Sequence, residues 1–300
     1  MKHFLMQLCA TIFLLTVVSF HSIGADNYTL EYNLEKGKTY NLSMVSATNM
    51  KMDIMGQEMI MDLSSEMNYQ YDVLEQNDGV FDITTFIKKV KMGMSSPMPF
   101  NVDSEFPEKS SDKSIGEAFK SLADIPIDIQ FTKLGKVISV KGAEKIEEKL
   151  SRISSDQVMQ MFGQSFSEKA IQAMYEQVST IFPDKPIAID ESWDVVKSMN
   201  TNGADIIIKT KLTLVQVKDN VATLDCTGTV SSPEGGTVIQ IQGMDATVSS
   251  KGTQSGTILI DLKSGWIIRS ELAQKSTQKI EIMGQELEQI LDSKTVITPY

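Results

Sequence analysis

Apolar and polar residues alternate from Tyr28 to Met94, which is the pattern of antiparallel β-strands that bury one face. The chain breaks this period at Lys36-Gly37-Lys38 and again at Asn77-Asp78-Gly79. Glycine and asparagine favour tight turns at such positions because they adopt a left-handed backbone at little cost. A meander of long strands is therefore expected in this region.

The clearest hairpin in this region surrounds Gly56-Gln57. Glycine in the first position of a two-residue loop predicts a type II′ turn, which would pair Ile54 with Met59. All apolar residues of the hairpin then share one face, and this face is the candidate ligand-binding surface. Its candidate residues are Met50, Met52, Met59, Met61, Tyr69 and Tyr71.

The pattern changes in the middle of the chain. Prolines, serines and charged residues between Ser95 and Glu117 predict a long loop, and strand character returns from Ile125 to Val140. Helical spacing of apolar residues follows from Ile146 to Phe182. Ser165 and Glu168 have the spacing of a capping box, Gly163 before them predicts a break, and Pro183 is expected to end the helix.

Strands return from Ile187 to Ile297. The expected fold class is α+β, mostly antiparallel β, with two curved β-rich halves joined by a helical segment. The expected division is a signal peptide at 1–25, an N-terminal antiparallel β domain at 26–142, a helical connector at 143–183 and a C-terminal antiparallel β domain at 184–300.

The two halves share a short repeat. Residues 52–59 recur as residues 280–287, with five identical consecutive residues, Ile-Met-Gly-Gln-Glu. A duplicated ancestral hairpin accounts for this repeat, and the alternative is that two independent turns use glycine for the same backbone reason.

Three segments resemble a family of uncharacterised secreted proteins from Gram-negative envelopes. These segments are Tyr32–Tyr40, the stretch Phe182–Trp193 and the turn Lys263-Ser264-Gly265-Trp266. In that family the second segment usually has Gly-Asp before Ser-Trp, whereas this chain has Asp190-Glu191. The family is a domain of unknown function, so the resemblance implies a fold and no catalytic residues.

The first 25 residues have the features of a secretory signal peptide. A basic start precedes an apolar run from Phe4 to Phe20, and small residues at Gly24 and Ala25 suit a signal peptidase. The mature protein, of about 275 residues, is then periplasmic or secreted. An uncleaved anchor helix is the alternative, although Gln7 and two threonines interrupt the run. No later segment is apolar and long enough to cross a bilayer.

Cleavage narrows the possible chemistry, because His3 and His21 are the only histidines. A mature chain without histidine excludes Ser-His-Asp and Cys-His catalysis and histidine zinc sites. The single remaining cysteine, Cys226, cannot form an intramolecular disulfide and is expected to be a buried, inert thiol. No catalytic residue, metal ligand or cofactor is assigned.

The mature chain keeps 27 basic residues against 39 acidic ones, a net charge of −12. Nucleic acids and anionic lipid surfaces would repel such a protein.

Methionine is the one unusual component, with 18 residues in the chain. Three interpretations remain open. The methionines near residues 50–61 fill the core face of a sheet, form a flexible surface for an apolar ligand, or supply thioethers to Cu(I).

Carboxylates are the last candidate chemistry. The candidates for an acid–base pair are Asp190 with Glu191, or Glu234, but neighbours on a strand point to opposite faces. The favoured function is a non-enzymatic protein that binds an apolar molecule or an envelope protein partner. The alternatives are a methionine-based Cu(I)-binding protein and a carboxylate-only hydrolase.

Overall fold

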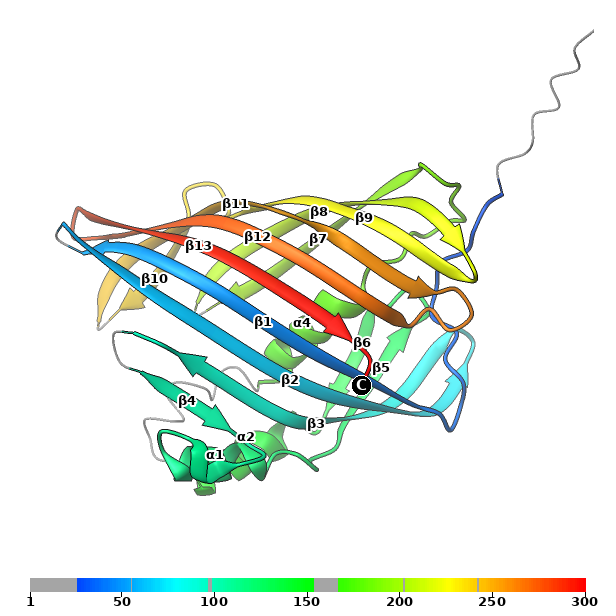
Figure 1. Ribbon diagram of the computed structural model, residues 1–300, viewed down its shortest axis with the longest axis horizontal. Coiled ribbons are helices and arrows are strands. Elements are labelled where there is room, and N and C mark those ends of the chain that lie inside the picture. The colour runs from blue at the N-terminus through cyan, green and yellow to red at the C-terminus, as the bar shows by residue number, and fades with distance from the viewer. Residues whose placement is uncertain (1–25, 55, 97–98, 154–166, 202, 242) are drawn as a thin grey trace, which may run out of the picture.

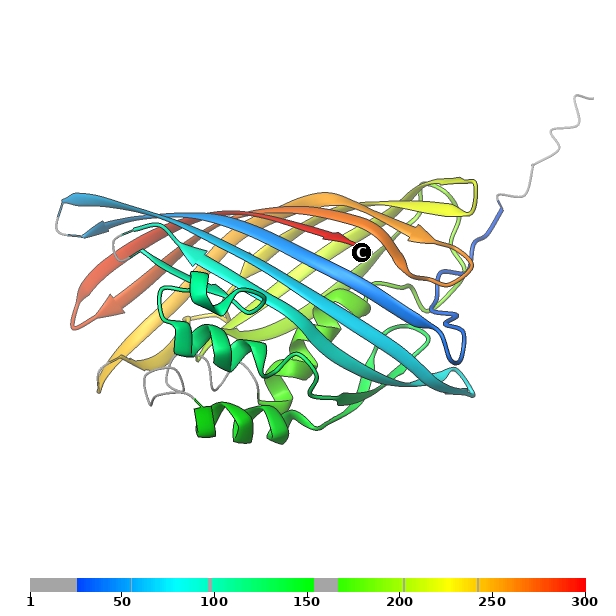
Figure 2. The same cartoon turned by 60° about the horizontal axis from the view of Figure 1, so that its bottom comes forward.

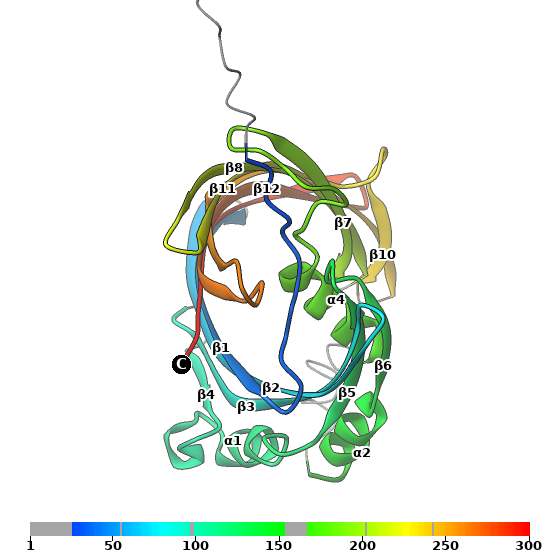
Figure 3. The same ribbon diagram turned by 90° about the vertical axis from the view of Figure 1, so that its right-hand side faces the viewer.

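Strands from both halves of the chain join in one antiparallel sheet in the computed structural model (Figure 1). The structure describes residues 26–300 except 55, 97–98, 154–166, 202 and 242. The expected signal peptide, the expected break at Gly163 and the expected cap at Ser165 lie outside the described residues. Figures 2 and 3 show that the sheet curves into a trough around one helix, α4 (Glu168–Ser179).

The sheet has thirteen strands within the described residues, in the order β6-β5-β3-β2-β1-β13-β12-β11-β9-β8-β7, with β4 added to β3 and β10 added to β11. Their bounds are β1 (Thr39–Ile54), β2 (Gln57–Asn77), β3 (Val80–Met94), β4 (Phe100–Asp103), β5 (Ile127–Thr132), β6 (Val137–Lys141), β7 (Ser192–Thr201), β8 (Ala204–Lys218), β9 (Val221–Ser231), β10 (Thr237–Ile241), β11 (Met244–Asp261), β12 (Ile267–Ile282) and β13 (Gln285–Thr298). This confirms the prediction of a mostly antiparallel β fold with helices between two strand blocks.

The two blocks meet in the middle of the sheet rather than standing apart. β1 and β13 pair over ten residues, from Ser43 opposite Thr298 to Met52 opposite Gln289. The expected picture of two joined halves is thus replaced by one continuous sheet. Local alternation could not reveal this pairing, because the partners lie about 240 residues apart along the chain. The domain boundaries at 142 and 183 stay a prediction.

The β1–β2 hairpin differs from its predicted register by two residues. Ile54 pairs with Gln57 instead of Met59, so Gly56 directly precedes the residue that closes the turn. Gly56, with φ +81°, therefore occupies the second loop position and not the first. A shift of two residues keeps every side chain on its predicted face, because side-chain direction alternates with period two.

The repeated segment forms a second hairpin beside the first. β12 and β13 join through Met283 (φ +52°) and Gly284 (φ +78°), both left-handed as a type I′ turn requires. Since β1 pairs with both β2 and β13, the two hairpins lie side by side at the same end of the sheet (Figure 1). In the sheet order β2-β1-β13-β12, each strand of the second hairpin lies two positions from the corresponding strand of the first. That the two hairpins arose by duplication stays a prediction.

Helix α4 lies on the concave side and contacts both free edges of the sheet, β6 and β7 (Figure 3). Its cap is Ser167, whose side chain accepts a hydrogen bond from Ala170, and it ends at Ser179, four residues before Pro183. The predicted loop at 95–117 instead contains β4, a short 3-10 helix η1 (Pro107–Lys109) and the start of α1 (Lys113–Lys120). α1 contacts β3 and β4, and α2 (Ala143–Ile153) contacts α1 and α4.

Residues 28–38, here called the N-terminal strap, cross the opening at one end of the trough (Figure 3). Leu30, Tyr32 and Leu34 are buried, so the predicted alternation is confirmed. However, the strap adds no strand to the sheet. Its backbone hydrogen bonds go to separate segments, including Lys133 before the β5–β6 turn and Ser264 in the β11–β12 turn. The strap thus ties together the turns that end the trough on this side.

Candidate ligand-binding site

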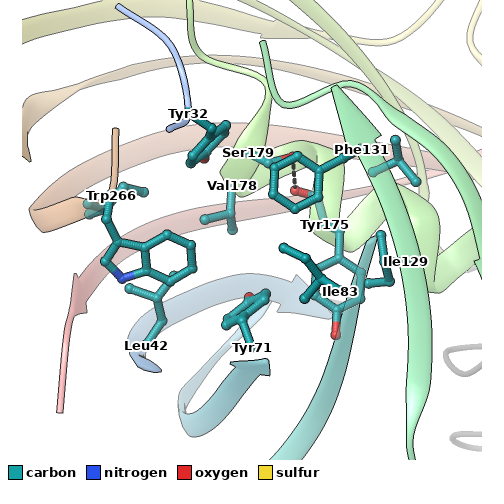
Figure 4. Close-up of a pocket in the computed structure, with 12 residues that line it drawn as sticks. Tyr32, Leu42, Tyr71, Ile83, Ile129, Phe131, Tyr175, Val178, Ser179 and Trp266 are labelled. Carbon is teal, nitrogen blue, oxygen red and sulfur yellow. Dashed lines mark hydrogen bonds between the residues drawn. The ribbon is translucent and has the colours of Figure 1, made fainter. Parts of the chain in front are cut away.

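The concave face of the sheet is filled at the strap end by nine aromatic rings, here called the aromatic cluster. The cluster consists of Tyr32, Tyr40, Tyr69, Tyr71, Phe81, Phe131, Tyr175, Phe182 and Trp266. Tyr71 is near its centre, with ring centroids 5.2 Å from Trp266 and 5.9 Å from Tyr175 (Figure 4). Both pairs meet edge to face, the arrangement that aromatic quadrupoles prefer.

Burial favours the neutral form of four tyrosine hydroxyls in this cluster. Burial raises the pKa of Tyr32, Tyr69, Tyr71 and Tyr175 well above the ordinary value. The hydroxyls of Tyr175 and Thr85 form a hydrogen bond of 2.8 Å, which satisfies two buried polar groups at once. These four side chains therefore add no charge to the aromatic cluster.

Two small cavities lie inside the aromatic cluster. One of about 30 Å³ is lined by residues such as Tyr32, Phe131 and Trp266, and one of about 40 Å³ by Met44, Tyr69 and Met174 among others. Both contact Leu42, Tyr71, Tyr175 and Val178. Spaces of this size hold one or two water molecules, so a ligand with an alkyl chain does not fit there while α4 stays in place.

Polar contacts hold the end of α4 in the gap between the two sheet edges. The hydroxyls of Ser179 and Thr180 donate to the Gly135 carbonyl at 2.6 and 3.0 Å, next to β6. On the other side, the indole N–H of Trp193 in β7 donates to the Ile181 carbonyl at 2.9 Å. Gly135 has φ +82°, and a Cβ there would lie only 1.9 Å from the Ser179 carbonyl oxygen. Glycine is thus required where the β5–β6 turn meets the helix.

The predicted methionines lie at the opposite end of the trough. Met50 pairs with Met61 and Met52 pairs with Met59, and all four side chains are half-buried. With their apolar neighbours they form a continuous surface, here called the methionine patch. It consists of Met50, Met52, Met59, Met61, Leu63, Leu287 and Leu291, all half-buried.

The structure separates the two groups of predicted ligand-binding residues. Tyr69 and Tyr71 are buried in the aromatic cluster, although they share a face of β2 with Met59 and Met61. Eight residues of strand separate Met61 from Tyr69, which corresponds to about 26 Å. The six predicted residues therefore share one surface but belong to two different environments.

A band of hydroxyl groups lies between these environments on the same face. Ser46 and Thr295 are 3.0 Å apart, and Thr48 and Ser293 are 2.8 Å apart, each pair joined across the β1–β13 contact. These hydroxyls form hydrogen bonds with each other, so none of them is left without a partner on a surface that is otherwise apolar.

Sequence reasoning missed the parts of the aromatic cluster that come from outside the meander. Tyr175 follows the buried Ile171 by four residues, so the helical period placed it on the buried face of α4. Trp266 belongs to the second strand block, yet it packs on Tyr40 and Tyr71 of the first. Its indole nitrogen is buried without a hydrogen-bond partner among the described residues.

The remaining candidates lie away from this face or are inert. Burial raises the pKa of the Cys226 thiol to about 11, which confirms a buried, protonated cysteine. Asp190 and Glu191 are exposed in a turn, where Glu191 accepts a hydrogen bond from the Ala188 N–H, and Glu234 is exposed in another turn. Within the described residues, no three His, Cys, Asp or Glu side chains group as metal ligands.

Comparison with known proteins gives a family and a fold. Residues 78–267 match a family of unknown function, DUF6263. The chain belongs to this family. No curated protein matches this DUF6263 chain. In the part of the chain that the structure describes, no helix has the length and apolar character needed to span a membrane.

Among solved structures, a lipovitellin studied for lipid–protein interactions aligns with a TM-score of 0.52 and 9% identity. The alignment covers 89% of the DUF6263 chain and 25% of lipovitellin, so this chain spans about a quarter of that protein. An outer-membrane channel from Pseudomonas putida F1 aligns at a TM-score of 0.25 with 6% identity, covering 90% of this chain and 97% of the channel. Only the first score supports a shared fold, that of an open, lipovitellin-like sheet.

Proposed function

We propose that this protein binds an apolar ligand on the concave face of its sheet, at the methionine patch. The observation that supports the proposal is a surface of seven half-buried apolar side chains on the inner face of the trough. Flexible methionine side chains adapt to varied apolar shapes, which suits a ligand without a fixed contour. The lipovitellin-like fold agrees with this role, since lipovitellin is a protein whose lipid interactions have been studied structurally.

The aromatic cluster has a different role in this proposal. Its rings are packed against each other and against α4, and its cavities hold no more than water-sized molecules. It therefore forms the core that fixes the curvature of the sheet. We further propose that the protein acts in the periplasm or outside the cell, on the strength of its signal-peptide-like first 25 residues.

Binding of N-phenyl-1-naphthylamine, a neutral dye that fluoresces in apolar surroundings, tests the ligand site. Met61→Glu places a charge within the methionine patch, and we expect it to weaken dye binding at least tenfold. Ile60→Glu is the matched control, because Ile60 is the preceding residue, points to the outer face and is already exposed. Equal binding by both variants and the natural protein would refute the site.

Cu(I) binding is the second candidate, because the register brings four thioethers into two adjacent cross-strand pairs. Replacing Met50 and Met61 together by leucine keeps the patch apolar and removes two sulfurs. An apolar-ligand site retains dye binding in this double variant. If the protein binds Cu(I), the natural protein keeps the metal in competition with a chromophoric chelator, whereas the double variant loses it.

A further inference from the structure

One charged side chain, Lys197, shares the concave face of the sheet. Across the thirteen strands, the described residues that share this face are otherwise apolar, hydroxyl, amide or glycine residues, together with the neutral thiol of Cys226. Lys197 follows Trp193 and Val195 on the inner face of β7, and Val195 is buried. Lys197 is therefore the one position among these residues where a charged group of a ligand could form an ion pair.

The positive charge of the Lys197 ammonium group is balanced only in part by its neighbours. It donates a hydrogen bond to the Gln177 carbonyl in the last turn of α4. It forms no ion pair with a described carboxylate. An ammonium group has three donors, so the helix end leaves two for another acceptor.

The electrostatics agree with this geometry. Burial lowers the pKa of Lys197 to about 8, and the charge of Glu176 on α4 acts in the opposite direction. Cys226 on β9 also faces the lysine, and its own pKa of about 11 keeps it neutral. A cation at a helix C-terminus is favourable in itself, but a carbonyl dipole neutralises much less charge than an anion does.

Lys197 and the methionine patch lie in the same hydrogen-bonded row of the sheet. From β7 the row passes through Ile208, Val230, Gly252, Ser276, Leu291, Met50 and Met61, each residue paired with the next. The row contains no second charge, and glycine and serine in its middle present little or no side chain. An apolar chain that starts at Lys197 can therefore follow the row toward the methionine patch.

We propose that Lys197 binds the anionic head of an amphiphile whose apolar tail lies along this row. The inference rests on the proposed function and adds the ligand class, namely long-chain molecules that end in an anionic group such as a carboxylate.

Three probes with the same 18-carbon tail test this proposal, namely oleate, oleyl alcohol and oleylamine, each measured by displacement of N-phenyl-1-naphthylamine. At pH 7 we expect oleate to bind at least tenfold more tightly than oleyl alcohol, and oleylamine to bind least. The preference for oleate falls as the pH rises through 8, because Lys197 loses its charge there. A preference for oleate that is unchanged from pH 7 to pH 9.5 would show that Lys197 does not bind the head group.

The variant Lys197→Met removes the charge and keeps an apolar chain of similar length. We expect it to bind oleate at least tenfold more weakly and oleyl alcohol as before, and Lys197→Arg to restore the preference. Lys209→Met is the control, since Lys209 is exposed on the outer face of β8. Unchanged oleate binding by a folded Lys197→Met protein would overturn the lysine assignment. If neither oleate nor oleyl alcohol displaces the dye from the natural protein, the proposed function itself fails.

Discussion

The two ends of the trough use the same strands for different purposes. At the strap end, β1 and β2 bury Tyr40, Tyr69 and Tyr71 beneath α4 and the strap. At the hairpin end, the same face of the same strands carries Met50 and Met61, which are only half-buried. Alternation along a strand therefore specifies which face is apolar, whereas the elements that pack on that face decide whether it becomes core or a binding surface.

Truncating a ring at the strap end should have the largest effect on stability. Phe81 is fully buried, so Phe81→Ala leaves a cavity and should lower the free energy of unfolding by about 3–5 kcal/mol. Met61→Ala at the hairpin end should cost about 1 kcal/mol, because its side chain is already partly in water. Urea denaturation of both variants measures the contrast. Equal losses would mean that the hairpin end is core as well.

The next largest effect is expected where α4 meets the β5–β6 turn. Gly135→Ala should destabilise the protein by roughly 2–3 kcal/mol, through an unfavourable left-handed backbone and a clash with the Ser179 carbonyl. Gly37→Ala separates the two causes, since Gly37 has a similar φ of +78° but no atom near the added Cβ. Similar melting temperatures for the two variants would show that close contact with α4 is unimportant.

A smaller effect is expected from one buried hydrogen bond. Tyr175→Phe removes the hydroxyl that pairs with Thr85 and should cost about 1–2 kcal/mol, because the Thr85 hydroxyl is then buried without a partner. Thr85→Val combined with Tyr175→Phe should recover part of this loss. A strictly additive double mutant, measured by urea denaturation, would contradict the pairing.

The sequence supports strand assignment well and distant pairing poorly. Alternation correctly placed the long strands and the shared face of Met50, Met52, Met59 and Met61. It gave the wrong loop position at Gly56, because the same glycine suits either position when the turn type is unknown. The register error was harmless only because it was an even number of residues.

The residues of the candidate site likewise divide into those that strand alternation predicts and those that depend on distant contacts. Tyr69 and Tyr71 were expected beside the methionines, and one strand does carry all of them. Their burial depends on Tyr175, which packs against both rings from α4 and lies about 100 residues away in the chain. The exceptional position of Lys197 likewise becomes visible only when the strands are placed in register.

Methionine-methyl NMR with oleate tests the proposed ligand site most directly, because each of the relevant side chains carries its own probe. With ¹³C-methyl methionine, and assignments from single Met→Leu variants, we expect the signals of Met50, Met52, Met59 and Met61 to shift on saturation. Met283, which is 83% exposed in the β12–β13 turn, and Met174, which lies on α4 and contacts the Tyr69 hydroxyl, should stay unchanged. Shifts confined to Met174 and Met67 would place the ligand in the aromatic cluster. Unchanged spectra at saturating oleate would contradict a ligand site in the trough.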